Sequence, residues 1–141
     1  MRDLHNSSTR YIMKLSSVVR SVLDSIAEDT SLSPVEARAF LFIATSSAPL
    51  YQKDIELEYG LSRATVSELM QNMEQKGMIY RTKDSTDRRK NRIMVCDILL
   101  PVAEEMIARM STIEDKLTEG ISEEDMSAFL HVIERMSQNM C

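Results

Sequence analysis

Apolar residues recur at every third or fourth position along much of the chain, which is typical of amphipathic helices. The first such stretch covers residues 4–26. A second helix is expected from Ser33, because Ser33-Pro34-Val35-Glu36 has the form of a capping box with proline in the first helical turn. The same spacing predicts two further helices over residues 52–59 and 62–76.

In the last third of the chain, apolar residues again recur at helical spacing. Asp97 is placed to cap a helix that has Pro101 in its first turn and ends at Gly120. Ser122 then begins a final helix, because three acidic residues follow it where the helix dipole favours negative charge. Both ends of the chain are therefore predicted to be long amphipathic helices.

Two segments between these helices are rich in residues that favour strands. Residues 78–83 and 92–98 contain Ile, Val, Tyr and Thr, and they predict a β-hairpin. Leu50 and Tyr51 are expected to add one short strand. The chain has only three glycines and three prolines, and 5% of its residues are aromatic. This scarcity disfavours an all-β fold, which needs frequent turns. The predicted class is mainly α, or α+β, with a two-stranded hairpin.

The order of elements between Gln52 and Arg92 is that of a winged helix-turn-helix. Gly60 suits the left-handed conformation that ends one helix, and Ser62 can cap the next. One side of that next helix is apolar, while the other carries small or hydrogen-bonding side chains that suit DNA base edges: Ala64, Ser67, Glu68, Gln71 and Gln75. This architecture indicates DNA binding.

Composition indicates a single domain of 141 residues, since a hydrophobic content of 43% supports one core. No apolar run approaches the roughly 20 residues of a membrane span. The first residues also lack the apolar core of a signal peptide. We therefore expect a cytoplasmic protein with no membrane partner.

Charge is unevenly distributed along the chain. The formal net charge is −5, which opposes binding to a polyanion, but residues 61–93 hold eight Lys or Arg against four acids. The rest of the chain thus carries −9. Six of these cations fall between Arg81 and Arg92, in the predicted hairpin. A basic segment directly after a helix-turn-helix favours phosphate contact over a solvated loop.

The segment from Tyr51 to Val95 resembles the MarR family of bacterial transcriptional regulators. The resemblance is carried by Gly60-Leu61-Ser62, Thr65-Val66-Ser67, Met73-Glu74-Gln75-Lys76-Gly77-Met78-Ile79 and Asp87-Arg88-Arg89. It implies a homodimer on a pseudo-palindromic operator, a repressor role, a recognition helix in the major groove and a wing arginine in the adjacent minor groove. The chain departs from the family pattern at several positions: Glu56, Thr86, Val95-Cys96 and Leu99.

These arguments give three sets of site residues. The recognition-helix set comprises Ser62, Arg63, Ala64, Thr65, Ser67 and Gln71, within which Arg and Gln can make bidentate contacts to guanine and adenine. Lys53 is expected to contact phosphate, as is Ser62. The wing set comprises Asp87, Arg88, Arg89, Lys90 and Arg92. The family resemblance implies that Asp87 braces Arg89.

The terminal helices carry more apolar surface than a small winged helix can cover, and we expect them to form the dimer. Residues 33–98 would be the DNA-binding lobe, and residues 1–30 and 99–141 the dimerisation region. The residues expected at the interface are Ile12, Leu15, Val19, Phe129, Ile133 and Met136. The alternative is that these helices fold back on their own chain.

The family resemblance also implies a small aromatic or anionic effector, for which the eleven methionines could supply an adaptable pocket wall, although core packing explains them more simply. Cys96 and Cys141 leave redox control as an alternative. No spacing of Cys, His or carboxylate indicates a metal, and no cofactor is predicted. No catalytic motif is present, so an enzyme is not expected. The main rival is a winged helix that binds proteins.

Overall fold

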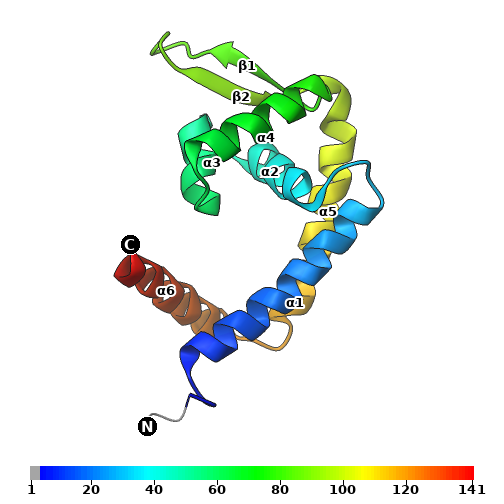
Figure 1. Cartoon of the computed structure of the whole chain (residues 1–141). Helices are drawn as coiled ribbons and strands as arrows, with labels where there is room; N and C mark the ends of the chain where they lie inside the picture. The colour runs from blue at the N-terminus through cyan, green and yellow to red at the C-terminus, as the bar shows by residue number, and fades with distance from the viewer. Residues whose placement is uncertain (1–3) are drawn as a thin grey trace. The chain divides into compact units, whose positions relative to one another are not determined.

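The computed structural model describes residues 4–141 as six α-helices, one short 3-10 helix and two strands (Figure 1). The elements in chain order are α1 (Ser8–Glu28), α2 (Pro34–Thr45), α3 (Gln52–Tyr59), α4 (Arg63–Gln75), β1 (Ile79–Lys83), β2 (Asn91–Val95), η1 (Asp97–Leu99), α5 (Leu100–Thr118) and α6 (Glu123–Met140). The chain divides into two compact units after Arg109, within α5. The first unit contains the winged helix, and α1 belongs to it.

The helix starts follow the predicted capping residues. Ser33 and Glu36 form the capping box, with the Ser33 N–H donating to Glu36 Oε2 at 2.9 Å and the Glu36 N–H donating to Ser33 Oγ at 3.3 Å. Ser62 Oγ accepts from the Thr65 N–H at 3.2 Å and begins α4. Gly60 ends α3 with a φ of 60°, which a residue with a Cβ adopts only at a cost.

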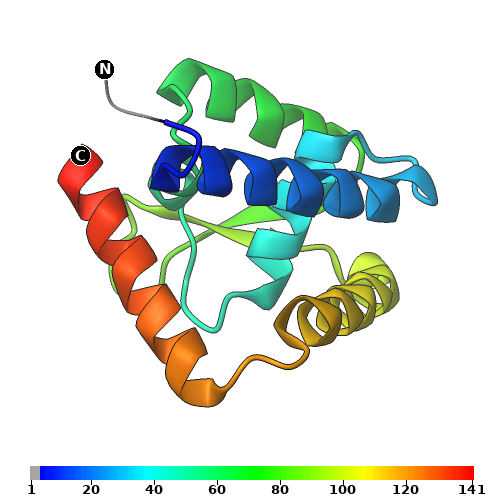
Figure 2. The ribbon, with the colours of Figure 1, turned by 90° about the horizontal axis from the view of Figure 1, so that it is seen from below.

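The core of the first unit lies where α2, α3 and α4 meet the hairpin. The predicted apolar stripe of α4 is buried: Val66, Leu69, Met70 and Met73. Phe40 of α2 and Ile55 of α3 are fully buried with them. Seen from below, α1 crosses in front of α2 (Figure 2), and its main contacts are with α2. This packing fixes the recognition helix against the rest of the winged helix.

The hairpin is antiparallel, with Ile79 opposite Val95 and Lys83 opposite Asn91. Leu50 joins it through a single bridge to Ile93, in place of the short strand expected at Leu50-Tyr51. The second strand was predicted to reach Ile98 but ends at Val95. The chain leaves the sheet there because the Leu99 N–H bonds the Cys96 carbonyl at 2.9 Å and Pro101 follows.

Two predicted helix starts were wrong. Asp97 does not cap α5 but is the first residue of η1, which leads directly into α5 with Pro101 in its first turn. The first helix begins at Ser8 and not at Leu4, because the Ser7 side chain accepts from the Arg10 N–H and caps the helix there.

The second unit, Met110–Cys141, contains the end of α5 and the whole of α6. Gly120, with a φ of 76°, lies in the turn that separates the two helices. Ser122 caps α6 as expected, its Oγ accepting from the Asp125 N–H at 3.1 Å. No residue of α6 is buried, so its apolar side chains remain at least partly uncovered by this chain.

Candidate nucleic-acid interface

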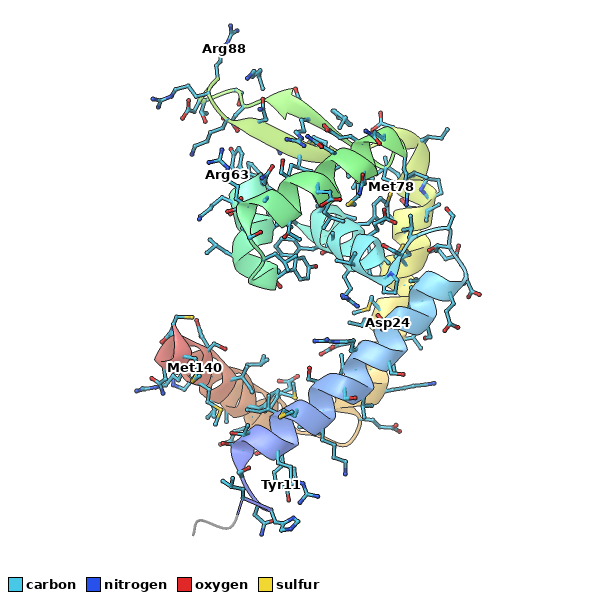
Figure 3. All side chains as sticks on the ribbon, viewed as in Figure 1. Tyr11, Asp24, Arg63, Met78, Arg88 and Met140 are labelled. Carbon is cyan, nitrogen blue, oxygen red and sulfur yellow. The ribbon has the colours of Figure 1, made fainter. Side chains whose placement is uncertain are left out.

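The polar side of α4 is open to solvent, and the predicted recognition residues lie along it. Ser62, Arg63, Ala64, Thr65 and Gln71 are exposed, while Ser67 is half-buried. Arg63 extends from the first turn of α4 (Figure 3). The Ser62 and Thr65 hydroxyls share a hydrogen bond of 2.8 Å in addition to the cap. The exposed face is therefore uncharged apart from Arg63 and Glu68, and it is rich in hydrogen-bonding groups.

Asp84 organises the tip of the wing, and sequence reasoning did not give it this role. Its carboxylate accepts from the Tyr51 hydroxyl at 2.5 Å, from the Thr86 hydroxyl and N–H at 2.6 and 2.8 Å, and from the Asp87 N–H at 3.0 Å. Bonds from Thr86, Tyr51 and Asp87 hold the pKa of Asp84 well below its usual range. Asp followed by Ser and Thr is itself a turn signal that could have revealed this residue.

Arg89 is held in an extended position by Asp87, as expected. Its Nε and Nη2 lie 3.1 and 3.3 Å from the two carboxylate oxygens, and its backbone N–H also donates to Asp87. The side chain of Arg89 is nevertheless 91% exposed. The contacts from Arg89 lower the pKa of Asp87. This geometry orders a guanidinium that still presents most of its surface to solvent.

Arg88 lies at the outer end of the wing (Figure 3), and Lys90 turns back toward α3. The Lys90 ammonium sits 5.3 Å from the centre of the Tyr51 ring, which is a cation–π distance. Tyr51 itself has a raised pKa because its hydroxyl donates to the Asp84 carboxylate. Tyr51 thus connects the start of α3 to both the wing turn and a wing cation.

A polar cleft of about 680 Å³ separates α3 and the start of α4 from the wing, and we call it the α3–wing cleft. Its walls come from all three of these elements: Tyr51, Gln52, Lys53, Asp54, Glu56, Arg63, Arg81, Lys90, Asn91 and Ile93. Four of these residues are cationic and two are acidic. Lys53, predicted to contact phosphate, is therefore grouped with recognition-helix and wing residues.

Arg92 is the one predicted wing residue that the structure separates from the others. It is half-buried and lines a different groove, with Leu50 and Leu100. Its position opposite Thr82 places it in the body of the hairpin, away from the turn at residues 84–90. Because strand side chains alternate between faces, Arg92 points away from the face of its neighbour Asn91, which lines the α3–wing cleft.

The far end of α4 is anchored by a buried carboxylate. Lys76 Nζ lies 2.7 and 2.8 Å from the two oxygens of Glu36, which is nearly inaccessible on α2. Burial acts to raise the pKa of Glu36, but hydrogen bonds from Lys76 and Ser33 outweigh it and the net pKa is lowered. The sequence identified Glu36 as a capping residue but gave no sign of its second partner forty positions away.

Comparison with known proteins agrees with this geometry. The model described as the MarR family matches residues 30–90, which include α2, α3, α4 and most of the wing. The winged-helix region of this chain is therefore similar to the MarR family. An uncharacterized HTH-type transcriptional regulator of Bacillus subtilis (strain 168), YwhA, is 30% identical over 86 residues. That match covers 61% of this chain and 62% of the relative.

Solved structures of similar fold extend beyond the part matched by the MarR model. MepR from S. aureus in its DNA-binding conformation is 20% identical, with a TM-score of 0.85 over 96% of this chain and 99% of MepR. CouR from Rhodococcus jostii RHA1, bound to p-coumaroyl-CoA, is 18% identical, with a TM-score of 0.81 over 96% of this chain and 95% of CouR. At these identities the likeness is one of fold.

A second cavity, about 550 Å³, lies within the first unit near α1, α2 and the start of α5. Its wall is largely apolar, with Ile26, Phe40, Met78, Leu99, Val102 and Met106. Arg109 also lines this cavity, and its guanidinium forms two ion pairs, at 2.6 Å with Asp29 and at 2.7 Å with Glu105. These contacts raise the pKa of Arg109, with Asp29 as the larger cause.

The residues expected at a dimer interface are incompletely covered. Ile12, Leu15 and Phe129 are each 42% exposed, and Val19, Ile133 and Met136 are half-buried. Cys96 is half-buried and Cys141 exposed, and both are free thiols. Within residues 4–141 no group of His, Cys, Asp and Glu is arranged to hold a metal ion, and none of the helices is long and apolar enough to cross a membrane.

Proposed function

We propose that this protein is a transcriptional regulator that binds double-stranded DNA through α4 and the wing. The observation that carries the proposal is the open polar face of α4 beside a wing whose turn is ordered by Asp84 and whose Arg89 is held by Asp87. MepR, which shares the fold, has been crystallised in complex with DNA, and its chain in that complex has a TM-score of 0.80 to this chain. In this arrangement α4 enters the major groove, and Arg89 reaches the adjacent minor groove.

Specific contacts follow from the exposed groups. Arg63, Thr65, Ser67 and Gln71 read base edges in the major groove, where each good bidentate pair gives roughly 1 to 3 kcal/mol of discrimination. Ser62 and Lys53 contact backbone phosphates. Arg88, Arg89 and Lys90 supply counterion release, and Arg89 favours the narrow minor groove of A-rich sequence.

The protein acts as a homodimer in this proposal. The apolar faces of α1 and α6 lack full cover within the chain, and burying them against a second copy removes them from water. A twofold dimer places two copies of α4 about 34 Å apart, one turn of DNA, so that each reads one half of a pseudo-palindromic operator. Occupation of such an operator blocks transcription, which makes the protein a repressor.

A small aromatic effector fits the cavity near α1 and α5. Its apolar wall suits a ring, and CouR holds p-coumaroyl-CoA. An anionic substituent on the effector could form an ion pair with Arg109 only by displacing Asp29 or Glu105 from its guanidinium. A thermal-shift titration with benzoate, compared with toluene, tests this requirement: stabilisation by benzoate that Arg109→Gln loses supports an anionic effector, and stabilisation by toluene alone supports a neutral one.

The decisive test of DNA binding is a salt titration with duplexes that the purified protein selects from a random pool. A complex held by phosphate contacts weakens linearly in log affinity against log salt, by about 0.9 per phosphate neutralised. A winged helix that binds only proteins would enrich no sequence from the pool. Failure to enrich any sequence would therefore overturn the proposal in favour of a protein-binding module.

A further inference from the structure

The α3–wing cleft lies where a DNA strand has to pass if the proposed function holds. With α4 in the major groove and the wing in the next minor groove, the two elements stand on opposite sides of the single phosphate strand that separates those grooves. The cleft separates the same two elements, and its walls come from α3, α4 and both wing strands. A backbone phosphate is thus the group that faces the cleft.

The charge on the cleft walls suits a phosphate. Its cations exceed its acids by two. Among the described residues, neither Arg63 nor Lys90 has a carboxylate within ion-pair distance. The Lys53 ammonium has only Glu56, at 3.6 Å, and the Lys53 side chain is 73% exposed. These side chains are therefore accessible to a ligand anion at little cost in existing contacts.

Two of the cations reach the cleft from different elements. Lys53 comes from the first turn of α3, and Lys90 comes from the wing, where the ring of Tyr51 holds its ammonium. Tyr51 is in turn tied to Asp84 at the wing turn. This chain of contacts fixes the separation of the two cationic walls before DNA arrives, so little ordering is needed on binding.

We propose that the α3–wing cleft binds one backbone phosphate of each operator half-site, and that Lys53 and Lys90 hold this phosphate from its two sides. The inference rests on the proposed function and assigns a shared ligand to residues from two separate elements. Arg63, at the edge of the same cleft, remains free for a base.

A phosphate shared by two lysines can be distinguished from two separate phosphates by the salt dependence of the affinity. The slope of log affinity against log salt depends on the number of phosphates neutralised and not on the number of lysines. Lys53→Gln and Lys90→Gln are each expected to weaken binding. The double variant should lower the slope of log affinity against log salt by about two for a dimer on its operator, because one phosphate in each of the two half-sites loses its neutralisation. Lys14→Gln/Lys116→Gln, which changes two exposed lysines outside the cleft, serves as the matched control and should leave the slope unchanged.

A single neutral methylphosphonate, moved along a selected duplex one position at a time, locates the phosphate. Wild-type protein is expected to show its largest loss of affinity at the position between the α4 and wing contacts, and Lys53→Gln/Lys90→Gln should show no further loss there. If the double variant retains the full loss at that position, or if its slope falls by about four, the two lysines do not share a phosphate, although sequence-selective binding still stands. Absence of selective binding by the wild type would overturn both proposals.

Discussion

Gly60 shows how one residue fixes the geometry of the helix-turn-helix. Its φ of 60° ends α3, and a Cβ added there would meet nothing within 4 Å. The cost of Gly60→Ala is therefore one of backbone conformation and not of crowding. We expect a loss of about 1 to 2 kcal/mol in the free energy of unfolding, measured by urea titration.

The matched variant for this prediction is Gly60→Asn, because asparagine tolerates the left-handed conformation better than alanine. It should retain more stability than Gly60→Ala. Equal stability of Gly60→Ala and the wild type would show that the turn does not require the observed φ.

Asp84 gives the wing a dependence on pH whose sign is set by its lowered pKa. A carboxyl with a pKa depressed by folding stabilises the native state above its unfolded value of 3.8, and this contribution is lost as pH falls through the folded pKa. Asp84→Asn removes that contribution. We expect the variant to be less stable than wild type at pH 6, with the difference shrinking as the solution becomes strongly acidic.

Acid unfolding followed by circular dichroism measures this difference. Asp115→Asn is a suitable control, since Asp115 is an exposed carboxylate on α5. A stability difference between wild type and Asp84→Asn that stays constant from pH 6 to strong acid would show that the charge of Asp84 does not contribute to the stability of the wing.

At the scale of elements, the wing should contribute to affinity through Arg89. The structure orders this side chain with Asp87 while leaving it 91% exposed. Arg89→Gln is expected to weaken binding to selected duplexes and to lower the salt slope by about two, one for each wing of the dimer, measured by fluorescence anisotropy. Arg20→Gln, at an exposed position on α1, is the control, and an unchanged slope in Arg89→Gln would remove the wing from the interface.

The elements themselves were largely predictable from local signals. The bounds of α3, the capping box of α2 and the buried stripe of α4 follow from spacing and caps, which act within a few residues. The end of β2 and the role of Asp97 were wrong, because the 3-10 turn before Pro101 competes with the strand pattern. Boundaries where two local preferences compete depend on tertiary packing.

The candidate site was predictable in outline but not in its internal contacts. The basic residues of the wing and the polar side of α4 could be predicted from the sequence, whereas the pairing of Asp87 with Arg89 was implied by the family resemblance. The contacts of Asp84 with Tyr51 and of Lys76 with Glu36 join residues 33 and 40 positions apart. No periodicity encodes such pairs, so a single sequence does not reveal them.

For the whole molecule, the uncovered apolar faces predict self-association. Ile133 lies half-buried on α6, a helix with no buried residue. Ile133→Glu would place an unpaired charge in the proposed interface, which costs roughly 3 to 5 kcal/mol and weakens the dimer at least about a hundredfold. Sedimentation velocity should then show monomer at concentrations where wild type is dimeric.

Glu134→Gln changes the adjacent, exposed residue of α6 and should leave the dimer intact. The DNA affinity of Ile133→Glu should fall with its dimerisation, because one α4 reads only half of the operator. A dimer unaffected by Ile133→Glu would place the interface elsewhere.

The central claim is that two copies of this chain present paired recognition helices and wings to one duplex. Titration of a selected duplex by fluorescence anisotropy, at a DNA concentration far above the dissociation constant, measures this directly. We predict saturation at two chains per duplex, and affinity about a thousandfold or more above that for a scrambled duplex. Saturation at one chain per duplex, or equal affinity for both sequences, would contradict the account.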